Sequence, residues 1–184
     1  DAVVEVGGRS LEEIRAAYAP NHRWSVRRGR ERVEVARLTS DEDLAAAYAA
    51  FAATRDRQGF SDLRAAPLLI PVMRRAVDEG HGVLLGSRVG DDVVAAAFLG
   101  TVGPEVEYLY GGYVDGAETL LPNHVLQDEA LALTVDGGWR GYNLGRLPVG
   151  ADRGCPPRRR SPREADGRGQ GRLRLAAHAA CRAA

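Results

Sequence analysis

The fold is decided by residues 107–150, which read EYLYGGYVDGAETLLPNHVLQDEALALTVDGGWRGYNLGRLPVG. Apolar and polar residues alternate at its start, and this predicts a strand over 106–110 that ends at two glycines. Pro122 suits the first turn of a helix, which a second pair of glycines ends. A final strand is expected over 141–147. The segment therefore predicts the succession strand, helix, strand.

Capping signals place the elements that precede this segment. Ser10 and Glu13 form a capping box that opens a short helix, and Pro20 ends it. The arginine-rich residues 22–32 are expected to form a connector. The remaining expected elements are strands over 33–38, 83–89 and 93–102, a helix over 41–57, and a helix from Pro71 to Gly80. This order predicts an α+β fold, in which helices flank a mostly antiparallel mixed sheet.

The chain has 184 residues and a formal net charge of zero, but the charge is unevenly distributed. Residues 151–184 carry nine arginines against three acidic residues, a local balance of +6. The body, residues 1–150, therefore carries −6. A negative balance argues against a nucleic-acid-binding surface on the body.

The sequence predicts no metal site. Its only cysteines, Cys155 and Cys181, form no C-x-x-C pair, and its four histidines are scattered, so neither a structural zinc site nor a disulfide framework is expected. Unpaired thiols fit a cytoplasmic location. No apolar run approaches the roughly 18–20 residues that cross a bilayer, so no transmembrane segment is expected.

The predicted order of elements resembles that of the GNAT (acyl-CoA N-acyltransferase) fold, and residues 107–150 resemble a narrower group within it. They are similar to the C-terminal GNAT-like domain of the Fem-type (FemAB-like) peptidoglycan-bridge aminoacyltransferases, the group of the lipid II:glycine glycyltransferases. The matching residues are Tyr108, Tyr110, Gly111, Gly112, Leu121, Pro122, Asn123, Leu126, Gln127, Glu129, Gly138, Tyr142 and Gly145. Upstream, residues 54–60 are similar to the family's T-x-x-R-x-G-F motif. Asp128 and Asn143 stand where the family usually has tryptophan and aspartate.

The resemblance divides the chain into three parts. Residues 1–32 are expected to form a linking helix and connector, and residues 33–150 the GNAT-like acyltransferase domain. The family's F-K-x-G-F-G-like ending, which completes its sheet, has no match after residue 150. Residues 151–184 are instead rich in arginine, proline and glycine. We expect this tail to be disordered or to come from an altered reading frame.

The resemblance also implies a reaction. Fem-type enzymes transfer an amino acid from aminoacyl-tRNA to an amine of a peptidoglycan precursor, which is lipid-linked or nucleotide-linked. On this interpretation the chain is a fragment of such an enzyme, binds no cofactor tightly, and acts in the cytoplasm or at the inner membrane face.

Two alternatives remain open. One is a GNAT N-acetyltransferase that uses acetyl-CoA on a small-molecule or protein amine, and the other is a non-catalytic GNAT-like scaffold. Residues 114–121 contain no R/Q-x-x-G-x-G/A loop of the kind that binds the pyrophosphate of coenzyme A. This absence favours the aminoacyl-tRNA donor.

Four residues are candidates for catalysis. GNAT folds bind the acyl carbonyl where two central strands separate, so that a free backbone N–H stabilises the developing oxyanion. Gly111 and Gly112 fall at this point, and small residues allow a substrate to approach the backbone, although a simple strand-ending turn would use them too. Tyr110 and Tyr142 are candidates for shaping the pocket or donating a proton, and the alternative for each is core packing.

Five further residues are candidates for substrate binding: Arg57, Tyr113, Asn123, Gln127 and Asn143. Arg57 has the chemistry to bind phosphates of the acceptor, unless it is a solvated surface arginine. Asn123 stands at a helix start, where it either helps to bind an anion or only caps the helix. Helix geometry separates Gln127, expected in the cleft, from Glu129 on the surface.

Overall fold

The computed structural model describes residues 2–59 and 63–145. Its strands are β1 Val3–Glu5, β2 Glu34–Arg37, β3 Gly82–Val89, β4 Asp92–Gly100, β5 Glu105–Tyr113 and β6 Gly141–Asn143. Its helices are α1 Leu11–Ala16, α2 Pro20–Arg30, α3 Asp41–Gln58, α4 Ala66–Asp78 and α5 Pro122–Asp136, together with a 3₁₀-helix, η1, over Ala117–Leu120. The predicted tail, and the last two residues of the predicted final strand, lie outside the described residues.

A six-stranded sheet in the order β1-β6-β5-β4-β3-β2 forms the centre of the described part of the chain. β5 and β6 pair in parallel, whereas each other pair of neighbours is antiparallel. The prediction of an α+β fold with a mostly antiparallel mixed sheet is confirmed. β1 was not predicted, because its three residues carry too short an alternation to identify a strand.

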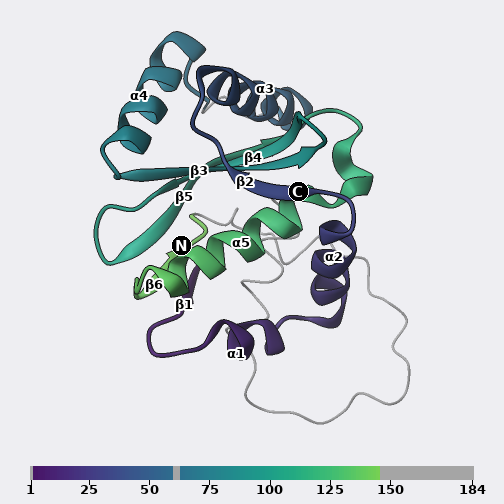
Figure 1. Cartoon of the computed structure of the whole chain (residues 1–184), viewed down its shortest axis with the longest axis vertical. Helices are drawn as coiled ribbons and strands as arrows, with labels where there is room; N and C mark the ends of the chain where they lie inside the picture. Colours follow the sequence, from purple (N-terminus) through teal and green to yellow (C-terminus); the bar gives the residue numbers. More distant parts are fainter. Residues whose placement is uncertain (1, 60–62, 146–184) are drawn as a thin grey trace.

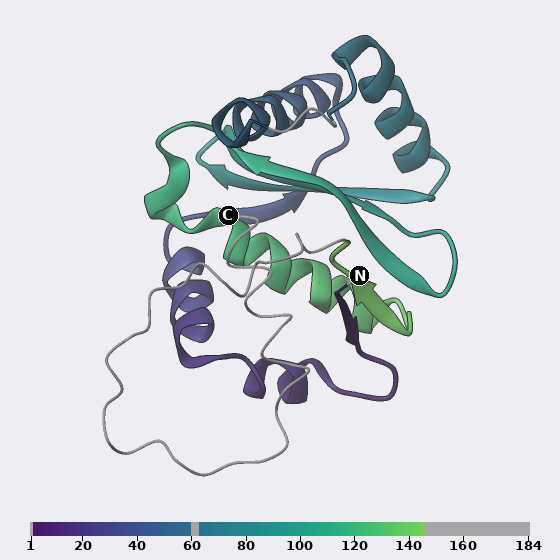
Figure 2. The ribbon, with the colours of Figure 1, turned by 180° about the vertical axis from the view of Figure 1, so that it is seen from behind.

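Helices cover both faces of the sheet (Figures 1 and 2). α3 and α4 lie on one face, where Phe51 and Met73 belong to a buried apolar cluster. α5 lies across the other face, and its Leu126 is buried with Tyr142 of β6 in a second cluster. α1 and α2 lie beyond α5 (Figure 1). As a result α5 runs between the sheet and the α1–α2 pair, and eleven of its 15 residues are buried.

The predicted connector over 22–32 is wrong, because α2 occupies most of it. Pro20 begins this helix at a position where a missing N–H costs nothing. His22, Val26 and Gly29 form a buried stripe at helical spacing. A side chain at Gly29 would meet Val125 of α5, so the glycine allows the two helices to approach closely. Packing against α5 thus stabilises this helix, which its arginine-rich composition did not predict.

The helix predicted to begin at Pro71 begins earlier, at Ala66. Pro67 takes the first-turn position, and Pro71 lies inside the helix. An interior proline removes one backbone hydrogen bond. Leu69 and Met73, on either side of Pro71, are both buried. Their burial in the apolar cluster under α4 compensates for the lost bond.

Candidate functional site

The parallel pairing of β5 with β6 covers only the first part of β5. β5 and β6 pair through Glu105–Glu107 and Gly141–Asn143, and β5 then continues to Tyr113 beyond this pairing. The Gly145 N–H donates a hydrogen bond to Asn143 Oδ1 at 2.9 Å, which turns the chain at the end of β6. Asn143, a predicted substrate-binding residue, therefore lies at the last residue pair between β5 and β6.

Gly111 lies on β5 beyond the part of this strand that pairs with β6. The Val114 N–H donates to the Val94 carbonyl, and hydrogen bonding alternates along an antiparallel pair. Gly111, three residues earlier, therefore directs its N–H and C=O away from β4 and toward the side of β6. A backbone N–H that lies beyond the point where two strands stop pairing can stabilise an oxyanion. The position of Gly111 is compatible with the catalytic role predicted for it.

Tyr108 covers Gly111. A side chain at position 111 would meet the hydroxyl and ring of Tyr108, so glycine lets this ring lie against the backbone. Tyr108 packs on the α5 face of the sheet. Burial raises its pKa, and the hydroxyl therefore stays protonated at neutral pH and is available as a donor. The sequence places Tyr108 in the motif but gives no reason to assign it a role.

Gly112 and Tyr110 face α3 on the opposite side of the sheet. A Cβ at Gly112 would lie 2.5 Å from both the Ala50 carbonyl oxygen and the Thr54 hydroxyl. The Tyr110 ring stacks on Phe51, with 6.0 Å between the ring centroids. The packing of α3 on the sheet accounts for both residues, and neither shares the face that Tyr108 covers.

Tyr142 and Gln127 meet in the core between the sheet and α5. The Tyr142 hydroxyl donates to Gln127 Oε1 at 2.7 Å, and both side chains are buried. Burial raises the pKa of Tyr142 well above its usual value. Gln127 faces the sheet while Glu129 is partly exposed, which is the separation that helix geometry predicts. This arrangement corresponds to the core-packing alternative for Tyr142.

Arg57 and Tyr113 meet at the end of β5. Arg57 donates to the Tyr113 carbonyl at 3.2 Å and pairs with Asp115 at 2.6 Å. Its guanidinium lies 4.0 Å from the centre of the Tyr113 ring, a cation–π contact. These contacts tie the end of α3 to β5. Arg57 belongs to α3 and Gln127 to α5, and these helices cover opposite faces of the sheet.

Asn123 is the second residue of α5 and not its cap. Leu121 is the N-cap, and its φ of 59° makes it the one non-glycine residue with positive φ in the described ranges. Such strain persists where the surroundings fix the backbone. The first turn of α5, Asn123 included, is buried, and the Ser87 hydroxyl donates to the Pro122 carbonyl at 3.4 Å. The predicted anion site at this helix start is therefore covered by protein.

A comparison with known families assigns this architecture. A model of the acetyltransferase (GNAT) domain family matches residues 15–153. The chain belongs to the GNAT acetyltransferase family. Among curated proteins, none matches the sequence.

Solved structures confirm that this GNAT domain has a Fem-like fold. The structure is similar to that of FemX, with a TM-score of 0.72 and 13% identity, over 97% of this chain and 57% of FemX. It is also similar to the C-terminal domain (DUF2156) of a putative lysylphosphatidylglycerol synthetase from Agrobacterium fabrum. That match has a TM-score of 0.60 and 14% identity, over 80% of this chain and 46% of the other. The chain thus spans only about half the length of these similar proteins.

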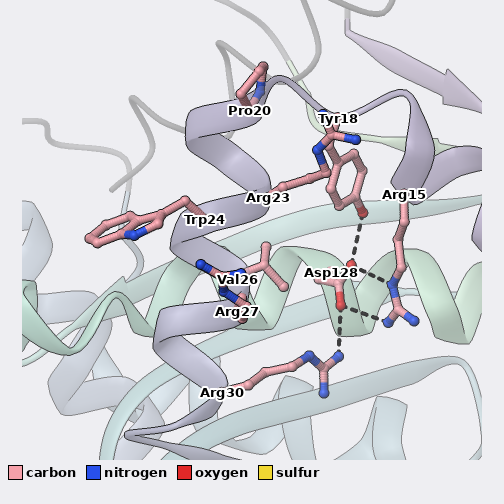
Figure 3. Close-up of a pocket in the computed structure, with 9 residues that line it drawn as sticks. All are labelled: Arg15, Tyr18, Pro20, Arg23, Trp24, Val26, Arg27, Arg30 and Asp128. Carbon is pink, nitrogen blue, oxygen red and sulfur yellow. Dashed lines mark hydrogen bonds and ion pairs between the residues drawn. The ribbon is translucent and has the colours of Figure 1, made fainter.

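The GNAT domain contains a buried carboxylate that sequence reasoning missed. Asp128 on α5 is 0% exposed. It accepts hydrogen bonds from Arg15 at 2.9 and 2.7 Å, from Arg30 at 2.7 Å and from the Tyr18 hydroxyl at 3.0 Å (Figure 3). Burial by itself would raise the pKa of Asp128, but the two guanidinium groups outweigh burial and hold the pKa below its usual value. The one sequence signal is its departure from the family pattern.

A pocket of about 700 Å³ lies beside this carboxylate, and we call it the arginine pocket. α2, α5 and the end of α1 supply most of its walls (Figure 3). Its lining residues are Arg15, Tyr18, Pro20, Arg23, Trp24, Val26, Arg27, Arg30 and Asp128. None of them was predicted as a site residue, because most fall in the segment expected to be a connector.

Two histidines form a buried pair between α2 and α5. Nδ1 of His22 lies 3.2 Å from Nδ1 of His124, so one ring donates to the other when both are neutral. The Tyr18 ring meets His22 edge-on, with 4.6 Å between the centroids. Burial, followed by the neighbouring His124, lowers the pKa of His22 to about 4, and burial lowers that of His124. The pair is thus stable in the neutral form.

We expect the domain to lose stability as the pH falls from 6.5 toward 4. In this window the unfolded state, whose histidine pKa is about 6.5, binds more protons than the folded state, so folding becomes less favourable at lower pH. The expected loss in the free energy of unfolding is about 2 kcal/mol.

Urea denaturation at several pH values measures this loss. In His22→Asn, which keeps a neutral hydrogen-bonding group near Nδ1, most of the slope should disappear; an unchanged slope would contradict the assignment. Asp128, with its lowered pKa, loses its contribution only below about 3.8.

Two negative findings concern the described residues only. Within residues 2–59 and 63–145, no group of three or more His, Cys, Asp or Glu side chains has the geometry to hold a metal ion. The same ranges contain no helix of sufficient length and apolar character to cross a membrane.

Proposed function

We propose that this GNAT domain transfers an amino acid from aminoacyl-tRNA to an amine of a peptidoglycan precursor, as part of a Fem-type enzyme. The observation that carries the acyl-transfer part is the end of the parallel pairing of β5 with β6 at Glu107, with the Gly111 amide directed to the β6 side of β5 beyond it. The fold of FemX supports the narrower assignment. Because this chain spans 57% of FemX, the acceptor and the whole reaction remain part of the proposal.

In the proposed reaction, the acceptor amine attacks the ester carbonyl of the donor. The Gly111 N–H stabilises the negative charge that develops on the carbonyl oxygen. Tyr108, whose hydroxyl lies over Gly111 and whose pKa is raised by burial, donates a second hydrogen bond to this oxygen or to the departing ribose hydroxyl. The amine passes its proton to solvent as the C–N bond forms and the ester C–O bond breaks, and the departing ribose oxygen takes a proton from solvent, so that an amide and a free ribose hydroxyl result.

The link between β5 and α5 supports aminoacyl-tRNA over coenzyme A as the donor. A coenzyme A site needs exposed backbone N–H groups at a helix start, where the pyrophosphate binds. Here η1 fills the link, and the first turn of α5 is buried. The acetyl-CoA alternative keeps the support of the family description, which is that of an acetyltransferase domain.

The setting and the acceptor are also proposed from the resemblance. The acceptor is a lipid-linked or nucleotide-linked muropeptide, and the reaction takes place in the cytoplasm or at the inner membrane face. Arg57 is the proposed phosphate contact, because its side chain lies at the end of β5 and is about one-quarter exposed. Tyr113, Asn123 and Gln127 position β5 and α5 around the reacting centre in this proposal.

Tyr108→Phe is expected to lower kcat for aminoacyl transfer about tenfold to a hundredfold while leaving the fold intact. The change removes only the hydroxyl and keeps the ring over Gly111. The full chain is incubated with tRNA charged with labelled amino acids and with a nucleotide-linked muropeptide, and mass spectrometry detects the added residue. Release of free thiol from acetyl-CoA tests the alternative donor.

Each outcome of this assay decides between functions. Transfer from aminoacyl-tRNA, lost in Tyr108→Phe, supports the proposal. Turnover of acetyl-CoA alone replaces it with the N-acetyltransferase. Absence of both activities, from a chain that circular dichroism shows to be folded, supports the scaffold. Tyr110→Phe is the matched control, since its ring stacks on Phe51 on the other face of the sheet.

A further inference from the structure

α2 carries two adjacent stripes of different chemistry. The buried stripe consists of His22, Val26 and Gly29 and packs toward α5. The second stripe, shifted by one residue, consists of Arg23, Arg27 and Arg30 and lines the arginine pocket. The helix has no acidic residue between Pro20 and Arg30. One face of α2 therefore packs against α5, and the adjacent face presents arginine side chains at successive turns.

Asp128 divides these cations into two kinds. Arg15 and Arg30 are held by its carboxylate at 2.7 Å. Arg23 makes one long contact, 3.5 Å, with the Ala16 carbonyl, and neither Arg23 nor Arg27 has an ion-pair partner among the described residues. The four guanidinium groups outnumber the single carboxylate, so the lining keeps a formal charge of +3. Arg23 and Arg27 are the cations available to a ligand.

Trp24 adds an aromatic surface to these cations. Its side chain is 53% exposed, which is high for a large aromatic ring. Figure 3 shows it projecting from α2 away from Asp128. A tryptophan face beside guanidinium groups is the combination by which proteins bind single-stranded nucleic acids, since bases stack on the ring and phosphates pair with arginine.

We propose that the arginine pocket binds single-stranded RNA, with a base on Trp24 and phosphates on Arg23 and Arg27. The proposal rests on the proposed function in one respect, namely that this RNA is the unpaired end of the aminoacyl-tRNA donor. α5, about 10–12 Å across, separates the pocket from Gly111. The pocket therefore binds nucleotides that precede the aminoacylated one, rather than the reacting ester.

Two observations favour RNA over the surface of an anionic membrane. The site is a concave pocket of about 700 Å³, a volume that suits one nucleotide unit. Within α1 and α2, Trp24 is the one exposed large apolar side chain, whereas a membrane-inserting helix presents a continuous apolar face. The net charge of −6 over residues 1–150 would argue against RNA binding if it were evenly distributed. It is not, because the pocket lining itself carries a formal charge of +3.

Fluorescence anisotropy of the full chain with a labelled single-stranded RNA of about ten nucleotides tests the proposal. Arg23→Gln with Arg27→Gln should weaken binding at least tenfold at low salt. The slope of log K against log salt should become shallower by about 1.4, because two phosphate contacts are lost. Trp24→Ala should weaken binding about fivefold to a hundredfold, whereas Trp24→Phe should restore most of the affinity through its ring.

Matched controls separate this pocket from other cations. Arg37→Gln with Arg75→Gln removes the same charge from β2 and α4, away from the pocket, and should leave RNA affinity nearly unchanged. Residues 151–184 also carry nine arginines. RNA binding that none of the α2 variants changes would assign the binding to other cations and overturn the proposal. Binding to phosphatidylglycerol vesicles but not to RNA, lost in the same variants, would overturn it in favour of a membrane.

The failure of this inference is distinguishable from that of the proposed function. If transfer from aminoacyl-tRNA proceeds with an unchanged KM for the donor in Arg23→Gln with Arg27→Gln, the function stands and the pocket assignment is wrong. If RNA binds through the pocket and no amino acid is transferred, the pocket assignment stands and the proposed reaction is wrong.

Discussion

Gly112→Ala is expected to lower the free energy of unfolding by about 3 kcal/mol. The added methyl group would lie 2.5 Å from the Ala50 carbonyl oxygen and from the Thr54 hydroxyl. A backbone oxygen within α3 cannot rotate away as a side chain does. α3 must therefore move off β5, which also disturbs the hydrogen bonds that join Thr54 to the Tyr113 backbone at 3.0 and 3.3 Å.

Thermal denaturation measures this effect as a fall in Tm of about 6–12 °C. Gly100→Ala, at the end of the neighbouring strand, is the matched control. Its added methyl group would meet the flexible end of Leu109 at 3.2 Å, so the expected change is below about 1 kcal/mol. Equal stability of the two variants would show that α3 does not press on Gly112.

Asp128→Asn should destabilise the domain by about 2–3 kcal/mol. Breaking a buried ion pair by removing one partner costs about 3–5 kcal/mol, because the remaining charge is left uncompensated. The cost is smaller here because the Arg15 and Arg30 side chains are 40% and 42% exposed, and water screens them. The same change also removes the acceptor of the Tyr18 hydroxyl.

Urea denaturation compares this variant with Glu129→Gln, which removes one negative charge from the next residue. Glu129 is 38% exposed and pairs with Arg30 at 3.1 Å, so its loss should cost less than about 1 kcal/mol. A double-mutant cycle of Asp128 with Arg15 should give a coupling energy between 0.5 and 3 kcal/mol. Strict additivity would mean that the ion pair between Asp128 and Arg15 contributes nothing to stability.

Local signals in the sequence predicted most of the elements correctly. The capping box predicted at Ser10 opens α1, and a second capping box, formed by Ser40 and Asp43, opens the helix that was predicted over 41–57. Pro122 begins α5, and the glycines after Asp136 end it. These signals succeed because capping and proline placement depend on residues three or four positions apart. α2 was not predicted from such local signals, because it is stabilised by packing against α5, about 100 residues later in the chain.

The faces of β5 were not predictable from alternation. A period of two puts Tyr108, Tyr110 and Gly112 on one face. The register against β4 shifts by one residue, where Phe98 pairs with Tyr110 but Leu99 pairs with Tyr108. This bulge turns Tyr108 to the α5 face and leaves Tyr110 and Gly112 facing α3. No residue type in this segment predicts the bulge.

The Asp128 cluster lay beyond the reach of sequence reasoning for a different reason. Its arginines precede it by 113 and 98 residues, so only the assembled fold brings them together. The departure of Asp128 from the family pattern identified an unusual position but not its partners. Among the predicted catalytic residues, Gly111 directs its backbone N–H to the β6 side of β5, whereas Tyr142 is buried in the core with its hydroxyl on Gln127.

The pairing of β1 with β6 has a consequence for how the chain folds during synthesis. Val3 pairs with Asn143, so β1 leaves the ribosome well before β6 and can pair with it only after the residues between them have been made. Closing so long a loop is slow, and the edge of the sheet at β6 forms late. β1 has only three residues and ends in Glu5. So short and charged a strand is a poor template for pairing with another chain before β6 is made.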